Sequence, residues 1–361
     1  MNIQPNSTTQ LNQDLFNTIK ALCRPDGVSG REQNVAAEIL RQITDIADEV
    51  KPDSLGNVLA FKKGAARPAK RVMLAAHMDE VGFIVTSITD DGLLKFAPVG
   101  GVNSKATCGR RVRVSDKGLP GVVGLVPIHL TESDDKGKAI PMDKLVIDIG
   151  AVDREEAEKW AAPGDCVHFI GEAVEFGGES GRDFLAAKAL DDRAGCAMMI
   201  EIMKRELPYD LWFAFTTQEE IGTRGAKGAA FSLEPDISII LETTASGDVS
   251  GVEGAERVTL IGGGAVVSYM DRGTIYDKVL YDHAFTLAKE RDIPCQTKTM
   301  IAGGNDAGAI SVSRGGVRTV AVSIPCRYLH SPCDMAKKSD IQAVYNLGLV
   351  LAETLPCGEH I

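Results

Sequence analysis

The chain has 361 residues, of which 44% are hydrophobic and 25% are charged, and its formal net charge is −11. This is a globular composition with enough residues for one large domain or two of moderate size. The acidic balance and the lack of a Lys/Arg cluster argue against a nucleic-acid partner.

The N-terminal stretch MNIQPNSTTQ is polar and has no apolar segment, so we expect no signal peptide. No apolar run approaches the roughly 18 residues that a membrane span needs, so no membrane partner is expected either. The eight cysteines are scattered without a CxxC pair, and several lie in apolar surroundings. Reduced, buried thiols of this kind indicate a cytoplasmic protein.

The first strong helix signal spans residues 29–43, SGREQNVAAEILRQI. Ser29 is placed to cap the helix, and Glu32 follows three residues later, which is the pattern of a capping box. Two strand-like runs follow, LGNVLAFKKG at 55–64 and KRVMLAAHMD at 70–79, joined by a turn-rich basic loop. Helix followed by strands predicts the start of an α/β domain.

The pattern changes between residues 81 and 178. Short alternating runs such as GFIVTSI, RVRVS, GVVGLVPI and DCVHFIG are separated by Gly, Pro and Asp at close intervals. Only DREEAEKWA at 153–161 reads as a helix. This pattern is typical of a small β-barrel or sandwich, so we expect residues 81–178 to form an all-β domain inserted into the α/β domain.

After residue 180 strands and helices alternate again. Ser339 and Gln342 suggest a second capping box at the last helix. The predicted fold class is therefore α/β, with one catalytic domain formed by residues 1–80 and 179–361. The predicted helices span 191–207, 225–233, 274–292 and 339–355, and the strands span 210–220, 236–244 and 317–325.

Several apolar runs end in ionisable residues. Burying such groups without partners costs several kcal/mol each, so partners are required. The runs are VMLAA before His77, Asp79 and Glu80, LWFAFTT before Glu219 and Glu220, ISIIL before Glu242, and VAVSIP a few residues before His330.

A further acidic pair, Asp191 and Asp192, stands at the start of a predicted helix. The carboxyl ends of strands in an open α/β sheet meet at one crevice, so these side chains should come together. Clustered carboxylates repel one another unless a cation lies between them. Taken alone, His77 could be an ordinary core histidine and Asp191 a helix cap. Taken together, they favour a pair of divalent ions, zinc or a similar metal.

The motifs HMDEVGF, ALDDRAGC, TTQEEIGTRGA, GGNDAGAI and IPCRYLHSP resemble, in order and spacing, those of the tetrahedral (TET) dinuclear metallo-aminopeptidases, which include glutamyl aminopeptidases and some proteins labelled endoglucanase. The resemblance covers nearly the whole chain. It implies a zinc-peptidase-like three-layer α/β/α catalytic domain and a barrel-like β-insertion that associates subunits. It also implies short peptide substrates and a homo-oligomer, from dimer to dodecamer.

Carried over to matching positions, the resemblance implies a set of ligands for two divalent ions per subunit. Zn²⁺ is the expected ion, and Co²⁺ and Mn²⁺ are the alternatives. Asp191 would bridge the ions. Asp79 would orient His77, and Glu219 would be the general base that passes a proton to the leaving amine. The remaining metal ligands would be His77 and Glu242 on one ion, and Glu220 and His330 on the other.

The family usually has Asp where this chain has Glu242, and Thr where it has Asn305. In related dinuclear hydrolases a Glu at the first position often accompanies carboxypeptidase or deacylase substrates. A metal-dependent amidohydrolase is therefore the alternative enzyme. A non-catalytic, metal-stabilised scaffold is the alternative from another class, although such a scaffold would not need the base Glu219.

Overall fold

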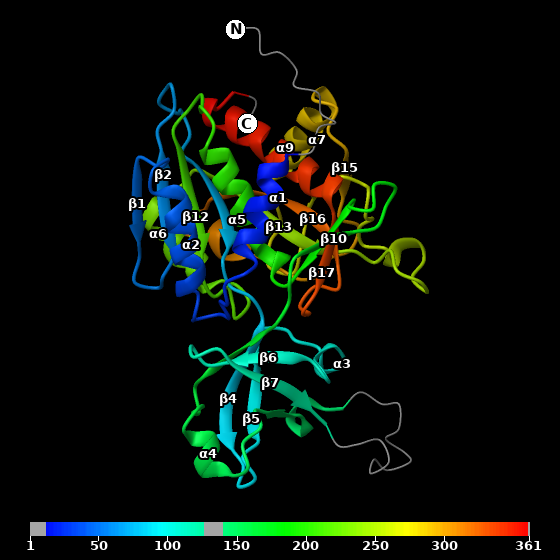
Figure 1. The fold of residues 1–361 in the computed structure, drawn as a ribbon. Coiled ribbons are helices and arrows are strands. Elements are labelled where there is room, and N and C mark those ends of the chain that lie inside the picture. Colours follow the sequence, from blue (N-terminus) through cyan, green and yellow to red (C-terminus); the bar gives the residue numbers. More distant parts are fainter. Residues whose placement is uncertain (1–11, 126–139, 360–361) are drawn as a thin grey trace.

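The structure is a computed structural model that describes residues 12–125 and 140–359. Figure 1 shows a larger α/β part and, beneath it, a smaller β-barrel. The helices are α1 (Gln13–Leu22), α2 (Gln33–Ile43), α3 (Ser104–Thr107), α4 (Arg154–Glu158), α5 (Leu190–Met203), α6 (Arg224–Leu233), α7 (Lys278–Glu290), α8 (Ala307–Ser311) and α9 (Lys338–Thr354).

A mixed sheet forms the centre of the α/β part, and β14 and β15 extend it beside β16. Its strands lie in the order β1 (Glu49–Pro52), β2 (Val58–Lys62), β12 (Leu211–Thr216), β3 (Val72–His77), β13 (Ile237–Ala245), β16 (Arg318–Arg327), β17 (Asp334–Lys337), β11 (Phe184–Ala187) and β10 (Val174–Phe176), with β14 (Ala265–Val267) and β15 (Cys295–Thr297) off this path.

The four strands β12, β3, β13 and β16 are parallel neighbours. Their residues are almost all buried, as expected for strands covered on both faces. Because the strands run in the same direction, their carboxyl ends meet at one edge of the sheet.

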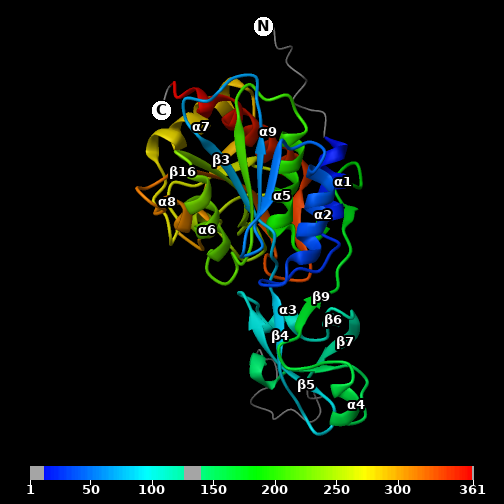
Figure 2. The same ribbon diagram turned by 90° about the vertical axis from the view of Figure 1, so that its left-hand side faces the viewer.

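Helices cover both faces of the sheet, which gives three layers (Figure 2). Apolar residues of α1, α2, α5, α7 and α9 pack on one face, and those of α6 and α8 pack on the other. Helix α1 has an apolar face that includes the fully buried Leu15, Phe16 and Ile19, and Asn12 caps it by accepting hydrogen bonds from the N–H groups of Asp14 and Leu15. The three-layer α/β/α prediction is confirmed.

The smaller part is a closed barrel. Alternate residues of its strands, such as Val112, Val114 and Val123, point inward and are fully buried, together with Phe83 and Phe169. Period-two alternation therefore builds this second core. The strand order around the barrel is β4 (Gly82–Ile88), β5 (Leu94–Val99), β8 (Val146–Asp148), β7 (Leu119–Gly124), β6 (Arg111–Val114) and β9 (Cys166–Phe169).

Three details differ from the sequence prediction. The segment 174–176 was expected in the inserted domain, which we ended at residue 178, but it forms β10 and pairs with β11 of the large sheet. Helix α2 begins at Gln33 without a side-chain cap, because the Ser29 hydroxyl binds Asp79 instead. Helix α9 begins at Lys338, which puts Ser339 inside the first turn rather than at the cap.

Some predictions fall outside the described residues. These are the last three residues of the GVVGLVPI run, 126–128, and the polar N-terminal stretch. Over residues 12–125 and 140–359, no helix has the length and apolar character to cross a membrane. All eight cysteines are free thiols, and Cys23, Cys166, Cys196 and Cys326 are buried.

Candidate metal centre and active-site pocket

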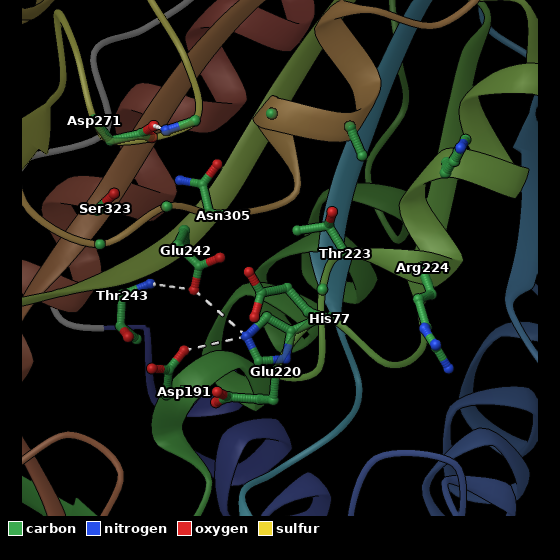
Figure 3. Close-up of a pocket in the computed structure, with 18 of the residues that line it drawn as sticks. His77, Asp191, Glu220, Thr223, Arg224, Glu242, Thr243, Asp271, Asn305 and Ser323 are labelled. Atoms are coloured by element: carbon green, nitrogen blue, oxygen red, sulfur yellow. Dashed lines mark hydrogen bonds and ion pairs between the residues drawn. The ribbon is translucent and has the colours of Figure 1, made fainter. Parts of the chain in front are cut away.

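The ionisable side chains that follow the parallel strands converge at their carboxyl edge (Figure 3). His77 is the last residue of β3 and pairs with Thr216, the last residue of β12. Glu242 lies level with His77, because Ile240 two residues before it pairs with Ala75. Glu242 follows the apolar run ISIIL, but it does not lie at the end of its strand. Strand β13 continues to Ala245.

Asp191 lies between the two histidines. One carboxylate oxygen, Oδ1, is 3.2 Å from Nε2 of His77, and the other, Oδ2, is 3.6 Å from Nε2 of His330. Asp192 takes no part in this contact. Its carboxylate accepts hydrogen bonds from the backbone N–H groups of His77 and Gly195, so it fixes the turn into α5.

Both histidines are oriented through Nδ1. Nδ1 of His77 is 3.2 Å from the carbonyl oxygen of Asp79 and 3.4 Å from its Oδ1, and Nδ1 of His330 is 3.0 Å from the carbonyl oxygen of Gly101. Because these acceptors bind the Nδ1–H of each ring, Nε2 of each ring points toward Asp191 and can bind a cation there in place of a proton. This is the orientation of a metal-ligating histidine.

Asp79 is fully buried and holds the loop after β12. Its Oδ1 accepts from the backbone N–H of Glu219 at 3.0 Å, and its Oδ2 accepts from the N–H of Glu220 at 3.1 Å and from the Ser29 hydroxyl at 2.6 Å. The loop turns sharply at Gln218, which has a φ of 56°. Asp79 therefore positions His77 and the Glu219–Glu220 pair together.

The cluster carries more negative charge than its surroundings can stabilise. Burial and the neighbouring carboxylates raise the pKa of Glu220 and Glu242 well above the usual value, and burial raises the pKa of Glu219 to about 8. Burial opposes ionisation of Asp191 as well, but the His77 hydrogen bond and the charges of His77 and His330 lower its pKa. Cations between these carboxylates would replace the protons.

Two groups of potential metal ligands share one residue. The atoms of His77, Asp191 and Glu242 lie within 4.8 Å of one another, and so do those of Asp191, Glu220 and His330. Two imidazole nitrogens with carboxylate oxygens suit zinc and similar divalent ions. The donor set therefore fits a pair of cations on either side of Asp191.

A second acidic group lies nearby but already contains cations. Asp26, Glu80 and His168 come together there. The Lys188 ammonium is 2.7 Å from Glu80 and 3.0 Å from Asp26, and the Arg193 guanidinium is 3.4 Å from Glu80. These ion pairs supply the partners that the buried Glu80 requires, so this group is a structural ion-pair cluster.

The potential metal ligands line a pocket of about 1330 Å³; they are His77, Asp191, Glu220, Glu242 and His330. Its walls include the end of β13, the first turn of α6, the loop at 302–305 and Lys298 after β15. Asn305 of the GGND motif is part of this wall.

Comparison with known proteins gives the family. Residues 56–347 match the family described as M42 glutamyl aminopeptidase. The chain belongs to the M42 family. It is therefore an aminopeptidase, an enzyme that hydrolyses peptide bonds, and the family is metal-dependent. The resemblance and the enzyme class inferred from the sequence are confirmed.

Individual relatives are similar over most of their length. A putative aminopeptidase of Acetivibrio thermocellus is 40% identical over 337 residues, which cover 93% of this chain and 97% of the relative. The lysyl aminopeptidase of Pyrococcus furiosus is 37% identical, covering 93% and 96%. A solved structure of the Pyrococcus horikoshii TET1 peptidase, which can assemble into a tetrahedron or a large octahedral shell, is 34% identical with a TM-score of 0.81, covering 94% and 99%.

Residues outside the motifs also support this M42 site, and their roles were not predicted from the sequence. Gly101 follows the barrel strand β5, and an added Cβ there would lie 3.1 Å from Nδ1 of His330. Glu32 and Ser29 bind the site loops instead of capping α2: Glu32 accepts from the N–H of Gln218 at 3.1 Å. The spacing of Ser29 and Glu32 predicted a capping box and so did not indicate this role. The Gly100–Gly101 pair, in contrast, could have indicated a close contact from the sequence.

Proposed function

We propose that this M42 enzyme removes N-terminal residues from short peptides at a centre of two divalent cations, Zn²⁺ first and Co²⁺ or Mn²⁺ as alternatives. The observation that carries the proposal is the shared position of Asp191, with a histidine Nε2 facing each of its oxygens. A single ion would not require both groups of ligands.

The proposed ligands follow the two groups. His77 and Glu242 would hold one cation, Glu220 and His330 would hold the other, and Asp191 would contact both. When bound, such cations supply Lewis acidity, which polarises a carbonyl group and lowers the pKa of water.

Glu219 is the proposed general base. It neighbours His77 and Glu220 but is outside the two groups that share Asp191, so its carboxylate is available to move a proton. Its raised pKa, about 8 without cations, suits a group that accepts a proton and returns it to the leaving amine near neutral pH. Asp79 positions this residue by accepting the hydrogen bond of its backbone N–H.

The charge of the site favours a free amino terminus. Two divalent cations bring four positive charges, whereas the cluster has five carboxylates, so the loaded centre keeps a net negative charge. A peptide ammonium would be attracted to this centre, and an N-acyl group would not. The carboxylates are Asp79, Asp191, Glu219, Glu220 and Glu242.

We also propose that the barrel, within the expected domain of residues 81–178, associates subunits into a homo-oligomer. Large apolar side chains stand exposed on it: Val152 is 80% exposed and Trp160 is 50% exposed. Exposed apolar side chains of this size often mark protein interfaces. The TET1 relative can assemble into a tetrahedron or a large octahedral shell.

Free thiols throughout the chain support a reducing compartment, and we propose the cytoplasm.

The test is hydrolysis of aminoacyl-p-nitroanilides and their N-acetylated counterparts by chelator-treated protein, before and after zinc or cobalt is added. We expect cleavage only of free-amine substrates and only after metal is restored. Cleavage of the acetylated substrates would contradict the proposal and support the amidohydrolase alternative.

Size-exclusion light scattering tests the proposed assembly of subunits. A stable monomer at micromolar concentration would contradict a homo-oligomer.

A further inference from the structure

One wall of the active-site pocket is a single face of α6. The residues that line the pocket after Arg224 follow it by three, four, seven and eight positions, which is the spacing of one helix face. They are Lys227, Gly228, Phe231 and Ser232. The pocket volume of about 1330 Å³ exceeds the roughly 1000 Å³ that bounds most small-molecule pockets, so several peptide residues have room along this wall.

This face of α6 presents two cations that have no acidic partner. Arg224 and Lys227 are exposed, and among the residues that the structure describes no carboxylate lies within ion-pairing distance of either side chain. Arg314, which also lines the pocket, is already engaged. Its guanidinium pairs with Glu234 at 2.9 Å, and its Cζ lies 4.0 Å from the centre of the Phe231 ring. Arg224 and Lys227 are therefore the cations of this wall that a ligand can pair with.

The negative charges of the pocket lie elsewhere. Its acidic residues are Asp271 and the four carboxylates that surround the proposed cations. Asp271 accepts a hydrogen bond from the Tyr276 hydroxyl at 2.6 Å. Figure 3 shows Asp271 and Arg224 on opposite sides of His77. The pocket is therefore acidic at its centre and basic along α6.

The part of the peptide that leaves should lie on the α6 side of the centre. Glu219, the proposed base, returns its proton to the leaving amine, so that amine must lie next to Glu219. Arg224 follows Glu219 by only five positions. The loop between them is compact, because the N–H of Thr223 donates to the carbonyl oxygen of Glu219 at 2.9 Å. The leaving chain therefore starts where α6 starts.

The length of this wall suits a short leaving chain. An α-helix advances about 1.5 Å per residue, so Lys227 and Phe231 lie about 4.5 Å and about 10 Å along α6 from Arg224. An extended peptide advances about 3.3 Å per residue, so a leaving chain of two or three residues spans about 7 to 10 Å. Its terminal carboxylate then lies within reach of the long side chains of Arg224 and Lys227.

We infer that Arg224 and Lys227 bind the free carboxyl terminus of the substrate, so that the enzyme prefers tripeptides and tetrapeptides with a terminal carboxylate to the same peptides with a terminal amide. Both are then specificity-determining residues, and this assignment rests on the proposed aminopeptidase activity. The bulk charge predicts the opposite order, because a net charge of −11 attracts the amide, which carries one more positive charge than the acid. A preference for the acid therefore requires local cations.

The test compares Leu-Ala-Ala and Leu-Ala-Ala-amide as substrates of the full-length, zinc-loaded protein. We expect kcat/KM of the wild type to be about 10-fold higher for the acid, through a lower KM, and this ratio to fall to about 1 in the double variant Arg224→Met, Lys227→Met. Cleavage of the amide and of Leu-p-nitroanilide should change by less than about 3-fold in the double variant, because neither has the carboxylate.

Lys289→Met is the matched control, since it removes an exposed lysine of α7 that does not line the pocket, and it should keep the acid-to-amide ratio of the wild type. Equal cleavage of the acid and the amide by the wild type would overturn the inference. An equal loss on both substrates in the double variant would overturn it as well.

A second readout does not depend on turnover. Calorimetry measures the binding of the dipeptide Ala-Ala, the leaving product, and of Ala-Ala-amide to the same zinc-loaded proteins. Tighter binding of the acid to the wild type, lost in the double variant, supports the inference, and equal binding of the two refutes it. If neither peptide nor the nitroanilide is cleaved but the acid binds selectively through Arg224 and Lys227, the proposed function fails while the binding site stands.

Discussion

The Nε2 atom of His77 lies 3.2 Å from Oδ1 of Asp191, although the two residues are 114 positions apart in the chain. Strand β3 delivers the imidazole and the start of α5 delivers the carboxylate. Charges and hydrogen bonds around them hold both groups in place. Burial alone would lower the pKa of His77, but the Glu242 charge and the Asp191 hydrogen bond raise it well above its usual value. A proton thus takes the place where a cation would bind.

Glu219→Gln should abolish turnover and preserve metal binding. The amide keeps the size of the side chain but cannot accept a proton, so kcat should fall by about 10³-fold. Metal content measured by plasma mass spectrometry should stay at the wild-type value. Retained turnover would remove Glu219 from the mechanism.

Asp79→Asn should weaken metal binding by about 10- to 100-fold, because the amide provides only one acceptor for the loop N–H groups and the His77 ring. Chelator competition measures this affinity. Ser29→Ala is the matched control, since it deletes only the hydroxyl donor to Asp79 at 2.6 Å, and its effect should be smaller. An equal effect of both variants would contradict the positioning role of Asp79.

Gly101→Ala should disturb only one of the two ligand groups. Its new Cβ would lie 3.1 Å from Nδ1 of His330, so the ring must shift. We expect weaker binding of one zinc ion and normal binding of the other in a calorimetric titration. Gly315→Ala is the control, because an added Cβ there meets no atom within 4 Å. Two normal binding events in Gly101→Ala would show that the contact is dispensable.

Lys188→Met should destabilise the fold in a pH-dependent way. Burial favours neutral Glu80, but the charges of Lys188 and Arg193 outweigh it and lower its pKa. The stabilisation from ionised Glu80 is therefore present above its unfolded pKa of about 4.3 and is lost as the pH falls through the lower folded value. Without Lys188, we expect a loss of about 3 kcal/mol in the free energy of unfolding at pH 7.

The loss should shrink near pH 4.5, because Glu80 of the variant can then take up a proton. Urea unfolding at the two pH values measures it. Lys278→Met, which breaks an exposed pair with Asp282, should cost no more than about 0.5 kcal/mol. A pH-independent loss would show that Lys188 acts through packing instead of charge.

The alternation of strands and helices, and the gathering of His and carboxylate residues after apolar runs, could be predicted because both depend on local patterns, whereas the three-layer arrangement came from the family resemblance. Apolar runs set the strands, and parallel strands must bring the residues at or just after their carboxyl ends, such as His77 and Glu219, to one edge. The supporting contacts were not predictable in this way. Ser29 has the spacing of a helix cap, which would accept a backbone N–H, yet in the fold its hydroxyl donates to Asp79, a residue 50 positions away. Lys298 follows a three-residue strand, and its burial depends on pairing between strands distant in sequence.

The central claim is that one site holds two divalent ions with Asp191 between them. The most direct measurement is anomalous X-ray diffraction at the zinc edge from crystals of the zinc-loaded protein. We predict two peaks, one beside His77 and Glu242 and the other beside Glu220 and His330, with a carboxylate oxygen of Asp191 toward each. A single peak, or two peaks that Asp191 does not join, would contradict it.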